Sequence, residues 1–226
     1  MSKRVFEKYV VQEERPVMTA KIVREAAIVV SLLTLGVAPV AADEKTLMLY
    51  GDSLMAGLGL SEADGFAGQL QRALGDDVTI VNASVSGDTS ADGRARLDWS
   101  LGERPDAVIL ELGANDMLQG LPVEAMRENL SAILARFEAE NIPVLLAGMR
   151  ASPSLGTEYV TAYDAVFPEL AQQYDAEFYP FFLEGVASDA SLNQSDGMHP
   201  NVNGINTMVE KFVPVAEDFL ARIKTE

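Results

Sequence analysis

The stretch that decides the fold is Thr46-Leu47-Met48-Leu49-Tyr50-Gly51-Asp52-Ser53-Leu54, or TLMLYGDSL. Its first five residues form an apolar, β-type run that predicts a buried strand. Gly-Asp-Ser then interrupts this run with residues typical of a turn. A serine at such a strand-to-loop turn exposes its hydroxyl at the edge of a sheet.

Apolar runs alternate with helix-like stretches along the rest of the chain. We expect strands over residues 46–50, 78–83, 107–112, 143–147 and 178–182. We expect helices over residues 64–74, 89–101, 122–140, 158–174 and 200–223, of which the third and the last are opened by a proline. This alternation predicts βαβ units with helices on both faces of a parallel sheet. Right-handed crossovers then favour an α/β fold, a three-layer flavodoxin-like sandwich with a parallel five-stranded sheet.

A serine nucleophile needs a neighbouring base, and His199 is the only histidine in the chain. His199 lies in Asp196-Gly197-Met198-His199-Pro200, directly before the last predicted helix. Asp196 is within reach of the imidazole across one turn, so it can bond Nδ1 and leave Nε2 free to face Ser53. We expect Ser53, His199 and Asp196 to be the nucleophile, the base and the orienting acid of a serine hydrolase.

Two polar loops follow the second and third predicted strands. Gly87 lies in Ser86-Gly87-Asp88-Thr89, where a helix begins. Its backbone N–H can approach a ligand closely, near the positive end of that helix. Asn115, in Gly113-Ala114-Asn115-Asp116, offers a neutral amide donor for an oxyanion. Because parallel strands bind ligands at their carboxyl ends, we expect Ser53, Gly87 and Asn115 to converge on one site.

Each of these residues also has a purely structural interpretation. Gly-Asp-Ser is a common turn tripeptide, and a lone histidine usually bonds nearby backbone groups. Gly87, Asn115 and Asp196 all suit ordinary turns. The placement of polar loops after three successive strands favours the functional interpretation. The rival acids, Asp52 and Asp116, are expected to brace their loops.

The composition argues against several classes of binding partner and several kinds of catalytic chemistry. The formal net charge of −17 repels phosphate backbones and anionic lipid, which argues against nucleic-acid or stable membrane-surface binding. The chain has no cysteine, which excludes disulfides, thiolate chemistry and a lipid-modified N-terminal cysteine. One histidine and no cysteine do not supply the usual ligands of catalytic zinc, so we expect no metal and no cofactor.

The N-terminal segment is expected to be separate from the domain. Lys21 and Arg24 precede the apolar run 26–38, and Val40-Ala41-Ala42 provides small residues at positions −3 and −1 of a cleavage site. This pattern predicts a signal peptide over residues 1–42 and an exported domain over 43–226. Met18 would give a leader of more ordinary length. A membrane anchor is the alternative, but the run is shorter than the roughly 20 apolar residues that span a bilayer.

With these four polar segments, the chain resembles the SGNH, or GDSL, hydrolases, whose four motif blocks supply Ser, Gly, Asn and His in that order. The blocks here are Gly51-Asp52-Ser53-Leu54, Ser86-Gly87-Asp88-Thr89, Gly113-Ala114-Asn115-Asp116 and Asp196-Gly197-Met198-His199-Pro200. The sequence of residues 81–89, VNASVSGDT, is especially similar to that of the exported thioesterase/lysophospholipase/arylesterase branch.

The resemblance implies an acyl-enzyme mechanism. Ser53 attacks an acyl carbonyl, His199 takes its proton, and the N–H groups of Ser53 and Gly87 with the Asn115 amide hold the oxyanion. In similar enzymes the segment after the asparagine forms a wall of the acyl pocket. Leu118 and Leu121, beside the loop 149–157, would therefore suit an apolar acyl chain.

We accordingly expect a monomeric, exported serine esterase, periplasmic or secreted, that hydrolyses short- to medium-chain carboxylic esters. Acyl thioesters and lysophospholipids are further expected substrates. A carbohydrate O-deacetylase using the same residues is the alternative enzyme, with Tyr50, Phe181 and Phe182 as the few aromatic candidates for sugar stacking. A catalytically silent binding module would lack at least one of Ser53, His199 and Asn115, and none is missing.

Overall fold

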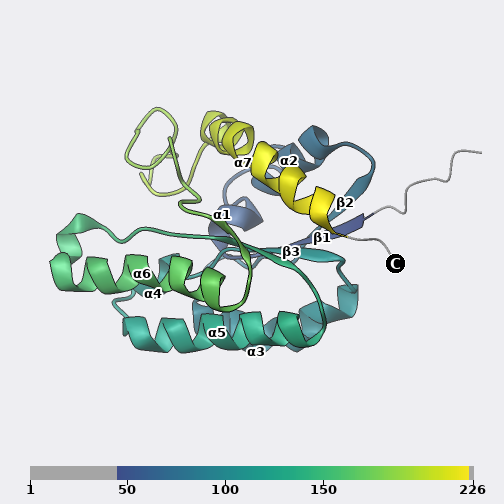
Figure 1. Cartoon of the computed structure of the whole chain (residues 1–226). Helices are drawn as coiled ribbons and strands as arrows, with labels where there is room; N and C mark the ends of the chain where they lie inside the picture. The colour runs from purple at the N-terminus through teal and green to yellow at the C-terminus, as the bar shows by residue number, and fades with distance from the viewer. Residues whose placement is uncertain (1–44, 224–226) are drawn as a thin grey trace, which may run out of the picture. The chain divides into compact units, whose positions relative to one another are not determined.

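The computed structural model describes residues 45–223. It contains a five-stranded, all-parallel sheet with the strand order β2-β1-β3-β4-β5, between two layers of helices (Figure 1). The predicted three-layer α/β sandwich is therefore confirmed. The strands are β1 (Lys45–Tyr50), β2 (Val78–Asn82), β3 (Ala107–Leu110), β4 (Val144–Ala147) and β5 (Glu177–Tyr179).

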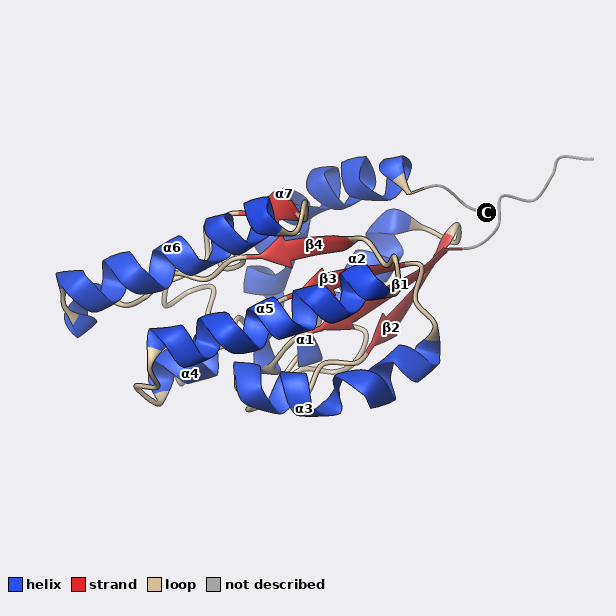
Figure 2. Ribbon diagram, turned by 60° about the horizontal axis from the view of Figure 1, so that its bottom comes forward, coloured by secondary structure: helices blue, strands red, loops and turns tan. Residues whose placement is uncertain are grey.

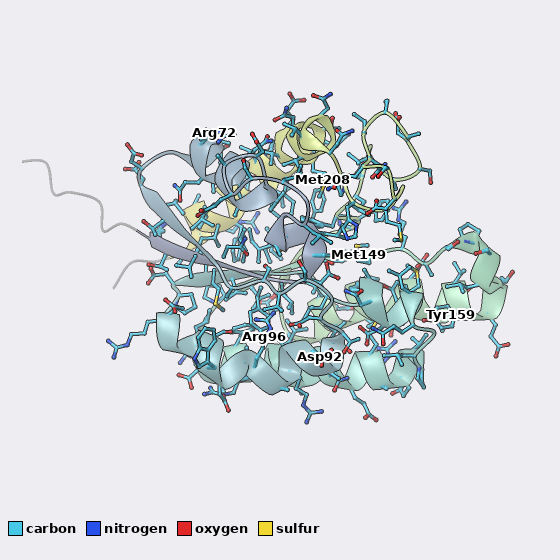
Figure 3. All side chains as sticks on the ribbon, turned by 180° about the vertical axis from the view of Figure 1, so that it is seen from behind. Arg72, Asp92, Arg96, Met149, Tyr159 and Met208 are labelled. Atoms are coloured by element: carbon cyan, nitrogen blue, oxygen red, sulfur yellow. The ribbon has the colours of Figure 1, made fainter. Side chains whose placement is uncertain are left out.

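The helices divide between the two faces of the sheet. The helices α2 and α7 pack together on one face, and α3, α5 and α6 cover the other (Figures 1 and 2). In the view from behind, Met208 of α7 and Arg96 of α3 lie on opposite sides of the sheet (Figure 3). The helices are α1 (Ser53–Ala56), α2 (Phe66–Leu74), α3 (Ser90–Ser100), α4 (Ala114–Leu118), α5 (Val123–Ala139), α6 (Thr157–Gln173) and α7 (Val202–Arg222), with short 3-10 turns at Leu101–Glu103 and Pro153–Leu155.

The central strands are recognisable in the sequence because both of their faces are buried. Residues 47–50, 107–110 and 145–147 are completely inaccessible to solvent. A strand covered by helices on both sides needs a continuous apolar run, not an alternating one. On the face under α2 and α7, the rings of Phe66 and Phe182 pack edge to face at 4.9 Å between centroids, and those of Tyr179 and Phe212 at 4.8 Å.

Several element boundaries differ from the sequence prediction. The last strand ends at Tyr179, not at residue 182, because Pro180 has no N–H to continue the ladder. Helix α7 begins at Val202 and not at Pro200, since the Asn201 side chain accepts the N–H groups of Asn203 and Gly204 and caps the helix. The short helices α1 and α4 were not predicted.

The strand order places a topological switch point at β1. The chain moves from β1 to β2 on one side and then crosses to β3 on the other. In open parallel sheets, ligands bind in the crevice beyond the carboxyl ends of the strands at such a point. The loops after β1, β2 and β3 carry Ser53, Gly87 and Asn115 respectively. Across residues 45–223, no helix has the length and hydropathy that a membrane span requires.

Candidate active site

Ser53 is the first residue of the one-turn helix α1. Asp52 caps this helix, because its Oδ1 accepts the N–H of Leu54 at 3.0 Å. Gly57 ends the turn in a left-handed conformation (φ 76°) that suits glycine. The cap fixes the serine directly beyond β1, so the nucleophile candidate lies on a short helix and not in the open turn that the sequence predicts.

The structure brings Ser53, His199 and Asp196 into one hydrogen-bonded chain. Ser53 Oγ lies 2.8 Å from His199 Nε2, and His199 Nδ1 lies 2.7 Å from Asp196 Oδ2. Asp196 Oδ1 accepts the backbone N–H groups of His199 at 3.0 Å and Met198 at 2.9 Å. These backbone bonds, with the bond to the His199 ring, lower the pKa of Asp196 to about 2. The carboxylate therefore remains charged over the whole range in which a histidine base works.

The loop that carries His199 is fixed by Gln194, a residue that the sequence analysis did not identify. The Gln194 side chain donates to the carbonyl of Leu58, beyond α1, at 2.8 Å and to that of Pro200 at 3.0 Å. The Gln194 N–H donates to the carbonyl of His199 at 2.7 Å. This amide thus joins the histidine loop to the segment that follows the serine, which limits how far His199 can move from Ser53.

Neither the Ser53 N–H nor the Gly87 N–H has a hydrogen-bond acceptor among residues 45–223. Gly87 has φ 91°, in the left-handed region, and precedes the N-terminus of α3, which Thr89 and Asp92 close with a capping box. Both N–H groups can therefore donate to a ligand.

Asn115 lies in α4 and connects the loops after β1 and β2. Its Nδ2 donates to Asp52 Oδ2 at 3.1 Å and to the carbonyl of Asp88 at 2.9 Å. The amide is therefore already oriented by the protein, and both of its N–H bonds have acceptors. Asp116 braces the neighbouring loop as expected, since its carboxylate accepts the N–H and the hydroxyl of Ser90 at 2.7 and 2.5 Å.

Arg96 of α3, which is labelled in Figure 3, connects two of the site loops. Its guanidinium donates to Asp88 Oδ2 and to the carbonyls of Ala83 and Gly51, the last at 3.1 Å. The same group lies 4.1 Å from the centroid of the Tyr50 ring. One side chain thus supports both the turn before Ser53 and the loop that contains Gly87. No sequence motif had marked this arginine.

An apolar cavity of about 330 Å³ opens beside the serine. Leu118, at the end of α4, lines it, and so does Met149 from the loop after β4. Leu121, which was also expected there, is not among the lining residues; its N–H donates to the carbonyl of Asp116 at 2.9 Å. Besides Ser53, Gly87, Asn115 and His199, the wall includes Leu54, Leu58, Met117, Leu183, Ala187 and Met198.

Within the described range, 45–223, no three His, Cys, Asp or Glu side chains are grouped as metal ligands. The chemistry available at the site is that of a serine, an imidazole and a set of hydrogen-bond donors facing an apolar cavity.

Comparison with known proteins decides the family. The model of the GDSL-like lipase/acylhydrolase family matches residues 49–205, a span that contains every site residue described above. The chain belongs to this family. The resemblance drawn from the four motif blocks is thereby confirmed.

Relatives of this GDSL-like acylhydrolase are esterases and thioesterases by name. Esterase TesA of Pseudomonas aeruginosa is 39% identical over 183 residues, which cover 79% of this chain and 91% of that protein. The Escherichia coli K12 protein thioesterase 1/protease 1/lysophospholipase L1 is 38% identical over 162 residues, or 71% and 78% of the two chains. A crystal structure of TesA matches with a TM-score of 0.74 at 38% identity and covers 77% of this chain and 99% of its own. The GDSL-like acylhydrolase is accordingly a carboxylic ester hydrolase.

Proposed function

We propose that this acylhydrolase cleaves short- to medium-chain carboxylic esters through an acyl-enzyme formed on Ser53. Ser53 Oγ attacks the carbonyl carbon while His199 Nε2 removes the hydroxyl proton. His199 then gives that proton to the departing alcohol. A water molecule, deprotonated by the same imidazole, releases the acid and restores the serine. Asp196 holds the imidazole and stabilises its charged form in both halves of the cycle.

The observation that carries this proposal is the chain Ser53–His199–Asp196 at the wall of an apolar cavity, beside two unused N–H groups. The N–H groups of Ser53 and Gly87 and the Asn115 amide are the proposed oxyanion donors. The N–H groups of Ser53 and Gly87 are oriented before substrate binds, so they stabilise developing charge without reorganising. The Asn115 amide exchanges one of its present acceptors, Asp52 or the Asp88 carbonyl, for the oxyanion.

The cavity lining supports recognition of an acyl chain more than of a sugar. It consists mainly of leucine, methionine and alanine side chains, and it includes no Tyr, Phe or Trp. Of the aromatic candidates for sugar stacking, Tyr50 and Phe182 are buried in the core, and Phe181 lies against Arg150. Thioesters and lysophospholipids, which appear in the name of the E. coli relative, present the same acyl group to such a pocket and are included in the proposal.

A series of p-nitrophenyl esters, with acyl-CoAs and acetylated sugars, tests the proposed substrate class. We expect kcat/KM to rise from acetate to medium-chain acyl groups, because each methylene that enters the apolar cavity contributes up to about 0.8 kcal/mol. A preference for acetylated sugars over all acyl chains would contradict the proposal.

Leu118 and Leu121 provide a matched pair of variants for the same assay. Leu118→Ala should lower kcat/KM a few-fold for the medium-chain ester and much less for the acetate, because only Leu118 lines the cavity. Leu121→Ala should leave the ratio between the two esters unchanged. Equal effects of both variants would place the acyl chain elsewhere.

We also propose that the chain is exported, with cleavage before Asp43, and acts as a monomer. The signal lies outside the described residues, so the support is the basic–apolar–small pattern of the sequence. All three triad members come from one chain, which supports a monomeric working unit. N-terminal analysis of the exported protein should begin at Asp43. Retention of the apolar run in a membrane fraction would contradict export as a cleaved enzyme.

A further inference from the structure

Glu111 is a completely buried acid that the mechanism above does not use. It follows β3, and its N–H donates to the carbonyl of Tyr50 at 2.9 Å. Its Oε2 faces the turn before Ser53 and lies 3.4 Å from the Asp52 N–H. A Cβ atom at Gly51 would lie 2.9 Å from this oxygen, so glycine is required for the two segments to approach so closely. The acid thus sits directly behind the nucleophile turn.

Asp52 joins this buried acid to the site. It too is completely buried, and its two oxygens serve two different catalytic candidates. Oδ1 accepts the Leu54 N–H and so caps the helix that begins with Ser53. Oδ2 accepts the side-chain amide of Asn115 at 3.1 Å. Any displacement of the Asp52 carboxylate would move both Ser53 and the Asn115 amide.

The acid groups of Asp52 and Glu111 are buried neighbours, because Glu111 Oε2 lies 3.4 Å from the Asp52 nitrogen and both side chains are inaccessible to solvent. Two ionised carboxylates can only accept hydrogen bonds and repel each other in the protein interior, so this close, buried arrangement requires a proton on one of them. Burial raises the pKa of both groups, and the neighbouring Asp52 charge raises that of Glu111 further, well above its usual range. Glu111 Oε1 receives no donor from residues 45–223, whereas Asp52 accepts two N–H donors. The proton therefore belongs on Glu111 and the negative charge on Asp52.

We propose that Glu111 is a positioning residue that remains protonated at neutral pH and donates its proton to Asp52. This bond holds the Asp52 carboxylate behind Ser53 and Asn115 and leaves the buried pair with a single negative charge. The inference rests on the proposed function, in which Ser53 and Asn115 carry the reaction.

The other charged and titratable groups around the pair come from four elements. The Asp88 carboxylate, in the loop before α3, raises the pKa of Asp52, and the nearby His199 lowers it. Arg96 of α3 binds Asp88 and so offsets part of its charge. The Tyr163 hydroxyl of α6 is buried, and burial raises its pKa. Tyr163 therefore stays neutral and adds no charge of its own near the pair.

Loss of the Glu111 proton at alkaline pH would place two negative charges side by side in the protein interior. Their repulsion would displace Asp52 from the Ser53 cap and from the Asn115 amide. We expect kcat to fall as this proton leaves, with a smaller change in KM, because Glu111 itself does not line the substrate cavity.

The test compares Glu111→Gln with Glu111→Met. Glutamine keeps a donor to Asp52 and an acceptor for its N–H but has no proton to lose. We expect E111Q to retain kcat at neutral pH and to lack the alkaline fall of the wild-type enzyme. E111M, which keeps the length but not the hydrogen bonds, should lower kcat by about 10- to 100-fold with KM almost unchanged, since small displacements of reacting groups have effects of this size. Asp116→Asn, at another buried carboxyl, is the control and should keep the alkaline fall.

Infrared spectroscopy gives a readout that depends on neither activity nor variants. Wild-type protein labelled with [13C]glutamate should show an isotope-shifted band of a protonated carboxylic acid at neutral pH. Absence of that band, or an unchanged alkaline fall in E111Q, would overturn the inference. If the band is present while Ser53→Ala still hydrolyses esters, the proposed function has failed and not the proton assignment. If Ser53→Ala is inactive and the band is absent, only the positioning role has failed.

Discussion

Ser53→Ala is expected to lower kcat by about 10⁶-fold, His199→Ala by a similar factor, and the double variant by no more than either. The reason is that Ser53 Oγ and His199 Nε2, 2.8 Å apart, act as a unit. Without the base the hydroxyl stays protonated, and without the hydroxyl the base has no proton to take. Because His199 is the only histidine, no second imidazole can replace it.

The measurement is kcat and kcat/KM for one p-nitrophenyl ester with all three variants, after circular dichroism has established that each is folded. Ser131→Ala, on α5 and away from the cavity, is the matched serine control and should retain activity. Losses that multiply in the double variant would mean that Ser53 and His199 act in separate steps. Near-normal hydrolysis by His199→Ala would refute the assignment of the base.

Asn115→Ala is expected to lower kcat by about 10²- to 10³-fold, with KM nearly unchanged. The amide is a neutral donor proposed for the oxyanion, and one such bond has an effect of this size in the transition state. The structure adds a second consequence. The same amide donates to Asp52 and to the Asp88 carbonyl, so its removal leaves the buried Asp52 Oδ2 without that donor. We therefore expect a lower thermal stability as well, equivalent to about 1–3 kcal/mol.

Asn115→Asp tests whether the position needs a hydrogen-bond donor and not merely a side chain of this shape. Aspartate has nearly the same shape but brings a negative charge close to both Asp52 and the proposed oxyanion. It should therefore be at least as inactive as the alanine variant. A change in KM alone in Asn115→Ala would show that Asn115 binds the substrate and not the oxyanion.

The fold was predictable because its strongest signals are local. The strands β1, β3 and β4 are buried on both faces and so appear as continuous apolar runs, and the helices between them are long enough for their apolar periodicity to be visible. The one-turn helices α1 and α4 were missed because four or five residues contain too few turns for a period. The end of β5 was misplaced because Phe181 and Phe182 are apolar but follow the ladder-breaking Pro180.

Only those site residues could be predicted that are recognisable from their neighbours in the sequence. Ser53, Gly87, Asn115 and His199 each follow a strand or precede a helix, and the parallel topology brings such positions together. The roles of the supporting residues depend on contacts between distant segments, and these leave no local pattern. Arg96 reaches the carbonyl of Gly51, Gln194 reaches that of Leu58, and Glu111 reaches Asp52.

The residues that line the acyl pocket were also only partly predictable from the sequence. Leu118 and Leu121 are equally apolar and only three residues apart in the sequence. The end of α4 directs only the first of them to the cavity wall, while the second follows the turn toward Tyr159, whose hydroxyl donates to its carbonyl. Which of two neighbouring leucines meets a substrate depends on the helix end, and this was not visible in the sequence.

The most direct test of the central claim is to trap the nucleophile. The enzyme is incubated with a p-nitrophenyl alkylphosphonate, which transfers its phosphorus to an activated serine, and the modified peptide is sequenced by mass spectrometry. We expect one adduct per chain, located on Ser53, with loss of hydrolysis in proportion to labelling and no adduct in His199→Ala. An adduct on another residue, or full hydrolysis by protein labelled at Ser53, would contradict the claim.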